Sequence, residues 1–284
     1  MRALGALVAV TAVWGVTFVQ VKDALELYPL FAFLAIRFAI ATLTLAPVAA
    51  TRLRGVGWGA GVTLGLLLAL GYALQTAGLE RTTVSSTGFV TGLYVVFTPL
   101  FAYALFRIRV GRSVLVGVVL SLVGLGLLTG VGVGDPIGDL LVLAGSAAYS
   151  LQIALMERYA SRYDPVAFTF VEMLAACIGF TAIAVSLGQL ELPRGATVWG
   201  ALLVTGVFAS ALAFLVQTWA QRRLSAARTA IAFAMEPVWT ALFGFWLAGD
   251  RLGAVGWTGA ALIMAAIVVS EPAAAEALRR LLRR

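Results

Sequence analysis

The sequence has no histidine, a single cysteine and few charges, and each shortage excludes a class of protein. With Cys177 as its one thiol, the chain can form no disulfide within itself. It also has no cysteine or histidine cluster with the spacing of a metal site. Cys177 lies inside an apolar run. We therefore expect no metal, no cofactor and no catalytic residues, and a membrane enzyme is the weakest of the functions considered.

Charged residues make up only 12% of the chain, whereas hydrophobic residues make up 62% and the mean hydropathy is +1.01. A water-soluble globule has an apolar share nearer half, so the composition predicts an integral membrane protein. Ten apolar runs of about 20 residues are long enough to cross a bilayer as helices, which predicts an all-α membrane protein. The ten predicted transmembrane helices are 3–21, 29–50, 57–79, 84–106, 113–133, 137–156, 165–187, 196–219, 226–248 and 252–270.

The net charge of +7 and the pI near 10.2 raise nucleic-acid binding as an alternative. The basic residues stand singly or in small groups between apolar runs, as in positive-inside anchoring, so we expect no nucleic-acid partner. A cytoplasmic N-terminus places 15 of the 20 basic residues inside the cell, which predicts that both termini are cytoplasmic. These 15 are Arg2, Arg52, Arg54, Arg107, Arg109, Arg112, Arg158, Arg162, Arg222, Arg223, Arg228 and four arginines after residue 271.

One stretch, residues 57–125, recurs at residues 199–267 with a constant offset of 142 and no gap. Rare polar residues coincide in this alignment, including Gln75 with Gln217, so the chain is a tandem duplication. Each copy has five spans, an odd number, so the second copy enters the membrane inverted. We predict a first five-helix repeat at 1–134, a second, inverted repeat at 137–270, and a basic cytoplasmic tail at 271–284.

An inverted pair of repeats favours transport by alternating access. Two similar halves that face opposite ways can exchange conformations, so that a site between them opens to one side and then to the other. Two alternatives stay open: a duplicated scaffold without this function, and a passive channel.

Polar residues within the spans are costly to bury and therefore indicate the site. In the third span Tyr72, Gln75 and Thr76 share one helical face, and the eighth span repeats the pattern with Phe214, Gln217 and Thr218. The first span laid on the sixth, at an offset of 135, brings Trp14 onto Tyr149 and Thr17 onto Gln152. Interhelical hydrogen bonds are the alternative reading of each residue. Their symmetric recurrence favours the lining of a cavity.

Glu236 and Pro237 in the ninth span form the sharpest single feature. Proline removes a backbone hydrogen bond, and the adjacent carboxylate needs a partner, water or a proton at that depth. Trp239 and Thr240 follow on the same face. Pro99 predicts a comparable kink in the fourth span, displaced by four positions from the repeat register. A packed structural kink is the alternative.

Arg37 and Glu172 are the other charges inside predicted spans. A rise of about 1.5 Å per residue places Arg37 and Glu172 at different depths in the membrane. A direct ion pair between them would require a tilted helix or a stretched side chain. Arg37 has two further interpretations, a substrate carboxylate as its partner or an outward anchor at the interface, and the anchor is the prediction we favour.

Two enzyme-like strings do not support an enzyme. Gly132 to Asp135 resembles an aspartyl protease motif, but no second aspartate lies inside a span. The alternating glycines from Gly55 to Gly61 lack the preceding strand and the following lysine of a nucleotide loop. We expect no ATP-binding subunit, so any transport is driven by gradients.

Several strings together resemble the EamA family of the drug/metabolite transporter superfamily. They are Trp14-Gly15 with Thr17-Phe18-Val19 and Lys22, Arg37-Phe38, the run from Leu93 to Pro99, and Glu236-Pro237-Val238 followed by Gly249-Asp250-Arg251. The resemblance spans nearly the whole chain. It implies a multi-pass carrier of the bacterial inner membrane, often an exporter of amino acids, with a cavity lined by spans 1, 3, 4, 6, 8 and 9. The family usually has glutamate where this chain has Asp250.

The residues and the resemblance together predict a secondary transporter that exports amino acids or related small metabolites. An exporter of lipophilic cations and a passive facilitator are the alternatives. The expected partners are the small substrate and the lipid bilayer, in a monomer or a homodimer. The candidate substrate-binding residues are Trp14, Thr17, Tyr72, Gln75, Tyr94, Tyr149, Gln152, Gln217, Glu236 and Trp239, and the candidate coupling or charge sites are Glu236, Arg37 and Glu172.

Overall fold

The computed structural model describes residues 2–129, 135–243 and 253–270, and these residues form helices without any strand. Asp250, the glycines before Asp135 and the tail at 271–284 lie outside the described residues. The helices are α1 (Arg2–Leu25), α2 (Leu30–Ala49), α3 (Trp58–Arg81), α4 (Val84–Gly92), α5 (Tyr94–Phe106), α6 (Arg112–Thr129), α7 (Pro136–Tyr159), α8 (Pro165–Ser186), α9 (Ala196–Val204), η1 (Thr205–Leu212), α10 (Ala213–Gln221), α11 (Ala226–Phe233), α12 (Met235–Phe243) and α13 (Ala254–Ser270).

Six segments of the described chain are long and apolar enough to cross a membrane. They are Leu30–Ala49, Trp58–Arg81, Ser86–Phe106, Pro136–Tyr159, Pro165–Ser186 and Ala196–Gln221. Three further helices, at Arg2–Thr17, Arg112–Leu128 and Ala254–Ser270, are apolar but shorter. The chain is therefore a multi-pass membrane protein, and the count of ten spans stays a prediction.

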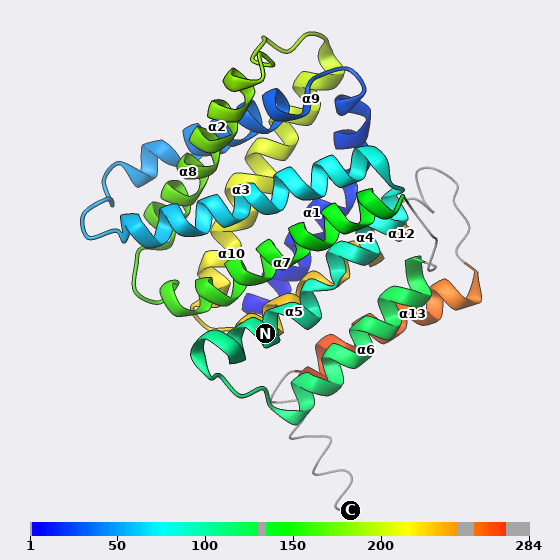
Figure 1. The fold of residues 1–284 in the computed structure, drawn as a ribbon. Coiled ribbons are helices and arrows are strands. Elements are labelled where there is room, and N and C mark those ends of the chain that lie inside the picture. The colour runs from blue at the N-terminus through cyan, green and yellow to red at the C-terminus, as the bar shows by residue number, and fades with distance from the viewer. Residues whose placement is uncertain (1, 130–134, 244–252, 271–284) are drawn as a thin grey trace, which may run out of the picture.

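Long helices pack across the bundle in pairs far apart in sequence (Figure 1). The central pair is α3 with α7, and α8 packs against both α2 and α3. α6 and α13 form a separate pair at one edge, and α1 packs against α12 and α10. The buried side chains form two main clusters, one around Leu125 and Ile263 and one around Phe33 and Phe38. Trp14 of α1 touches both clusters, which places α1 between them.

Two spans are broken at matching points. The break between α4 and α5 lies at Leu93 (φ −63°, ψ −10°), and the break between α11 and α12 lies at Ala234 (φ −59°, ψ −9°). The two positions agree with the repeat offset of 142 to within one residue. The prediction of a kink at Pro99 was wrong, because Pro99 lies inside α5 and the break comes a turn and a half earlier. Pro237 falls in the first turn of α12, where its missing N–H has no intrahelical partner to lose.

The eighth predicted span is interrupted in a different way. Its middle, η1, is a π-helix of eight residues between α9 and α10. Bonding from residue i to i+5 widens the turn and is often found at functional sites. The corresponding part of the first half, inside α3, is an uninterrupted α-helix.

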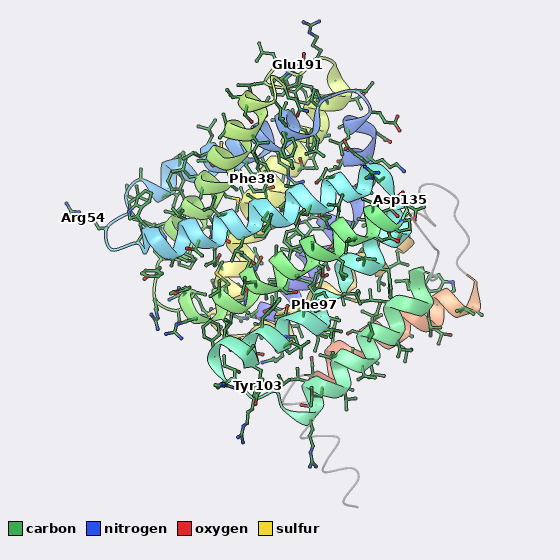
Figure 2. The ribbon with its side chains drawn as sticks, in the orientation of Figure 1. Phe38, Arg54, Phe97, Tyr103, Asp135 and Glu191 are labelled. Atoms are coloured by element: carbon green, nitrogen blue, oxygen red, sulfur yellow. The ribbon has the colours of Figure 1, made fainter. Side chains whose placement is uncertain are left out.

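Polar contacts distinguish the two ends of the bundle. At one, here called the basic end, Arg52 pairs with Asp164 at 3.4 Å and Arg158 lies over the ring of Phe106. At the other, the acidic end, Asp135 pairs with Arg81 at 3.7 Å. Figure 2 shows Arg54 and Asp135 beyond opposite ends of α3, with Phe38 inside the bundle. The basic end therefore comprises the ends of α2, α5 and α7, and the acidic end comprises the end of α3 and the start of α7.

Candidate functional site

One cavity of about 80 Å³ gathers nine of the ten candidate substrate-binding residues, all except Trp239, and also Arg37. It is large enough for several water molecules or a small solute. Both halves of the chain contribute to its walls. The lining residues are Trp14, Thr17, Val21, Arg37, Tyr72, Gln75, Thr76, Leu79, Thr91, Tyr94, Tyr149, Gln152, Ile153, Phe214, Gln217, Phe233 and Glu236.

Aromatic rings form much of this wall. Tyr72 of α3 and Tyr149 of α7 meet edge to face, with ring centroids 5.5 Å apart. Trp14 lies between Phe214 and Phe233, at 5.8 and 4.9 Å. Edge-to-face contacts of this kind fix ring orientations and leave π faces available to a ligand. The indole N–H of Trp14 donates to the carbonyl oxygen of Ala209 in η1 at 2.8 Å, which holds the ring in place.

The first of the two repeated amides connects three helices of the cavity wall. Gln75 of α3 accepts from the hydroxyl of Tyr149 at 3.0 Å and donates to Oγ1 of Thr91 at 2.9 Å. Thr91 is fixed from the other side, because the hydroxyl of Ser146 donates to its carbonyl oxygen. Both ends of this amide are therefore oriented, which is what a directional polar contact with a ligand requires.

The second amide lies in a longer network at the basic end of the cavity. Gln217 of α10 donates through Nε2 to Oε1 of Gln152 and to Oε1 of Gln221, both at 3.0 Å. Gln221 donates in turn to the carbonyl oxygen of Ile153. Gln217 is only 1% exposed. The equivalent residues Gln75 and Gln217 thus have different environments, and the network ties α7 to α10 at this end.

Arg37 does not take the position that we favoured from the sequence. Its side chain is only 5% exposed and points into the cavity, so the prediction of an outward anchor was wrong. Nε donates to Ser210 at 2.8 Å and Nη2 donates to the hydroxyl of Tyr72 at 3.0 Å. The guanidinium also lies over the ring of Tyr72, 4.6 Å from its centroid. These inward partners stabilise the cation where a lipid-facing position would leave its donors in hydrocarbon.

Glu172 lies behind the cavity and does not line it. It is fully buried, and its Oε1 accepts from Nε2 of Gln152 at 2.6 Å. It forms no ion pair with Arg37 in the described part of the chain, although the two residues occupy equivalent positions of the two halves at the offset of 135. Glu172 thus orients Gln152, which is the residue that faces the cavity.

Glu236 lines the cavity from the first turn of α12. Arg37, Tyr72, Tyr94 and Tyr149 line the same cavity. The wall of the cavity therefore carries a carboxyl group and a guanidinium together with three tyrosines.

Trp239 does not line the cavity, so the structure does not bring it together with the other candidate substrate-binding residues. It stacks instead on Phe243, with ring centroids 6.1 Å apart. One helical turn advances the chain by about 5.4 Å, so a residue on the same face can lie beyond the cavity. The side chain of Thr240 lies outside those described.

Sequence reasoning left seven lining residues out of the candidate list: Val21, Thr76, Leu79, Thr91, Ile153, Phe214 and Phe233. Thr76 and Phe214 were on the polar faces identified above but were not selected. Phe233 is the equivalent of Thr91 at the offset of 142, and because neither residue was selected, the repeat register gave no signal for the other. Val21, Leu79 and Ile153 carry no polar signal. The segments that the resemblance implied all contribute residues to the lining of this cavity, and α2 adds Arg37.

Comparison with solved structures identifies the fold. A crystal structure covering 99% of this chain and 98% of its own superimposes with a TM-score of 0.79 at 20% sequence identity. An identity this low establishes a shared fold and nothing further.

Curated relatives add the family. An uncharacterized transporter of Archaeoglobus fulgidus is 32% identical over 263 residues, which cover 93% of this chain and 83% of that protein. The uncharacterized inner membrane transporter YedA of Escherichia coli K12 is 28% identical over 281 residues, covering 93% and 89%. The EamA-like transporter family matches residues 1–130 and 136–270. This chain therefore belongs to the EamA-like transporter family.

Proposed function

We propose that the protein is a secondary transporter that carries a small metabolite, such as an amino acid, by alternating access between two inverted five-span repeats. The observation that carries this proposal is one cavity lined by both halves of the chain, with paired aromatic and amide groups contributed by equivalent spans. A site at the interface of repeats, near the middle of discontinuous helices, is typical of such carriers.

Matched packing supports the inverted repeat. α3, in the third span of the first half, packs against α7, in the first span of the second half. In the same way α10, in the third span of the second half, packs against α1, in the first span of the first half. α5 with α7 and α12 with α1 form a second matched pair. α2 with α8 and α6 with α13 are contacts between equivalent spans, as expected for halves related by a two-fold axis.

Unequal packing at the two ends supports alternating access. At the basic end α11 packs against α7, where Oε2 of Glu157 accepts the N–H of Ala226 at 2.8 Å. The equivalent contact at the acidic end joins α4 to α1, which have no comparable packing among the described residues. The cavity instead extends there to Val21 and Leu79. This asymmetry fits a carrier closed at the basic end and opening at the acidic end.

The arginines support an orientation for this state. Among the described residues, Arg52, Arg54, Arg107 and Arg158 lie at or just beyond the ends of α2, α5 and α7 that form the basic end. Arginine and lysine are enriched on the cytoplasmic side of membrane proteins. The basic end is then cytoplasmic, and the cavity faces outward. Both termini are cytoplasmic in this arrangement.

Counterflow in proteoliposomes tests the proposal. Vesicles containing the protein are preloaded with a mixture of unlabelled amino acids, and labelled ones are added singly, with and without a pH gradient. We expect transient uphill uptake, because a carrier exchanges its two states with substrate bound. Uptake that never exceeds equilibrium would indicate a facilitator or channel. Counterflow of tetraphenylphosphonium without any amino acid would favour the exporter of lipophilic cations.

Glu236→Gln tests the role of the cavity acid in the same vesicles. We expect the initial rate of counterflow to fall by about 10- to 100-fold, since a charged hydrogen bond contributes about 1.5–3 kcal/mol. Any response of the counterflow rate to the pH gradient should also disappear in Glu236→Gln. Glu191→Gln, an exposed acid away from the cavity, is the matched control and should leave the rate unchanged. Unchanged affinity and pH response in Glu236→Gln would remove this residue from the mechanism.

A further inference from the structure

Arg37 is a buried cation that faces the cavity with neutral partners. Its two hydrogen bonds go to the hydroxyls of Ser210 and Tyr72, and no carboxylate pairs with it in residues 2–129, 135–243 and 253–270. Burying an ion without a counter-charge is costly, and buried arginines usually pair with an anion. A buried arginine without a carboxylate partner at the wall of a cavity indicates that its counter-ion is an anionic group of the ligand.

The geometry of Arg37 leaves donors for such a ligand. Arginine has five N–H donors in a planar fork, and the contacts to Ser210 and Tyr72 use two of them. Those contacts, with the ring of Tyr72 beneath the guanidinium, fix the plane of the fork. A carboxylate matches a fork of this kind by accepting two parallel hydrogen bonds.

A second unfilled position lies on the same cavity. Tyr94 lines it and is only 4% exposed, yet its hydroxyl has no hydrogen-bond partner in the described part of the chain. A buried hydroxyl without a partner costs free energy that a polar ligand group would recover. Tyr94 and Glu236 both line this cavity, and a phenol oxygen and a carboxyl oxygen can each accept a hydrogen bond from an ammonium group.

We propose that Arg37 is the receptor for the carboxylate of the transported molecule, and that the substrate is a zwitterion whose ammonium group lies toward Glu236 and Tyr94. This assignment rests on the transport function proposed above and narrows its substrate class. It excludes lipophilic cations as the principal substrates, because a buried guanidinium beside the site repels a ligand that brings only positive charge.

Matched analogues test the assignment on the wild-type protein. Counterflow of labelled leucine is challenged with leucine, isopentylamine or 4-methylpentanoate, and counterflow of labelled phenylalanine with phenylalanine, phenethylamine or 3-phenylpropanoate. We expect each amine, which lacks only the carboxylate, to compete about 10- to 100-fold less well than its amino acid. An amine that competes as well as the amino acid would overturn the assignment.

Variants then connect the discrimination to Arg37. In Arg37→Gln the amino acid should lose affinity by about the same factor, while the amine keeps its affinity or gains some because the repelling guanidinium is gone, so the gap between them closes. Arg37→Lys retains the positive charge but not the planar fork of donors, so its affinity for the amino acid should fall between those of the wild type and Arg37→Gln. Arg52→Gln, which removes an exposed arginine at the basic end, is the matched control. A gap that persists in both Arg37 variants contradicts the proposal.

Ligand-dependent thermal stability of the purified full chain separates this inference from the transport function. If leucine or phenylalanine stabilises the wild type but not Arg37→Gln, and no counterflow occurs, Arg37 binds a carboxylate and the carrier proposal fails. If tetraphenylphosphonium shows counterflow and neither amino acid binds, the carrier stands and the zwitterion is wrong. If no compound binds or moves, both proposals are wrong.

Discussion

We expect a covalent link between positions 157 and 226 to stop transport almost completely and a reducing agent to restore it. The N–H of Ala226 at the start of α11 lies 2.8 Å from Oε2 of Glu157 near the end of α7, so cysteines placed there are within reach of a one-carbon methanethiosulfonate cross-linker. The link would hold the basic end closed. A carrier that must open this end in every cycle then retains less than about 5% of its rate.

The chain suits this experiment because Cys177 is its single thiol. Cys177→Ala gives a cysteine-free background into which Glu157→Cys and Ala226→Cys are introduced. The untreated double variant is the reference, since Glu157→Cys also removes an acceptor from the start of α11. Each single variant treated with the reagent controls for modification alone. A fully linked protein that transports at the unlinked rate would refute alternating access through this end.

Gly65→Leu should prevent the folded protein from accumulating. A Cβ at Gly65 would lie 2.4 Å from the carbonyl oxygen of Glu172 and 2.8 Å from Cβ of Ala175, so α3 and α8 would have to separate. Small residues permit this approach, and both neighbours belong to or adjoin a backbone that cannot rotate away. Overpacking usually costs about 1–3 kcal/mol, and the clash with backbone places Gly65→Leu at the upper limit or beyond it.

Size-exclusion chromatography in detergent and the thermal midpoint are the measurements. Gly65→Ala should remain folded with a midpoint lowered by several degrees, and Gly65→Leu should give no monodisperse peak. Gly200→Leu is the matched control, because a Cβ at Gly200 in α9 meets nothing within 4 Å. A normal peak and midpoint for Gly65→Leu would show that the two helices are not held at this distance.

The sequence predicted which residues gather at the cavity better than how each is oriented. Gln75 and Gln217, Tyr149 and Trp14 were identifiable because polar and aromatic residues recur at equivalent positions of the two halves. Their role in binding remains a prediction. Helical spacing defines a face but not a depth, which is why Trp239 was placed in the cavity although it stacks on Phe243.

The orientation of Arg37 could not be predicted, because it depends on partners far away in sequence. Ser210 is 173 residues from Arg37, and its hydroxyl is presented by η1. Nothing in the local sequence of η1 predicts a π-helix. The break at Leu93 was also missed, since proline is a visible signal for a kink whereas Leu93 has none.

The π-helix η1 makes the two halves of the cavity unequal in helical phase. Each residue of an α-helix rotates the chain about the helix axis by about 100°, and each residue of a π-helix rotates it by less. Over the eight residues of η1 the difference from an α-helix is on the order of the rotation of one residue. Thr76 of α3 lines the cavity, whereas its repeat equivalent Thr218 does not and bonds instead to Thr169 of α8, although Gln217 lines the cavity as its equivalent Gln75 does. In the proposed carrier, exchanging the conformations of the two halves would therefore not regenerate the same binding surface. A transported substrate would meet a different set of side chains on each side of the membrane, and we expect its affinity and its rate of release to differ between the two openings.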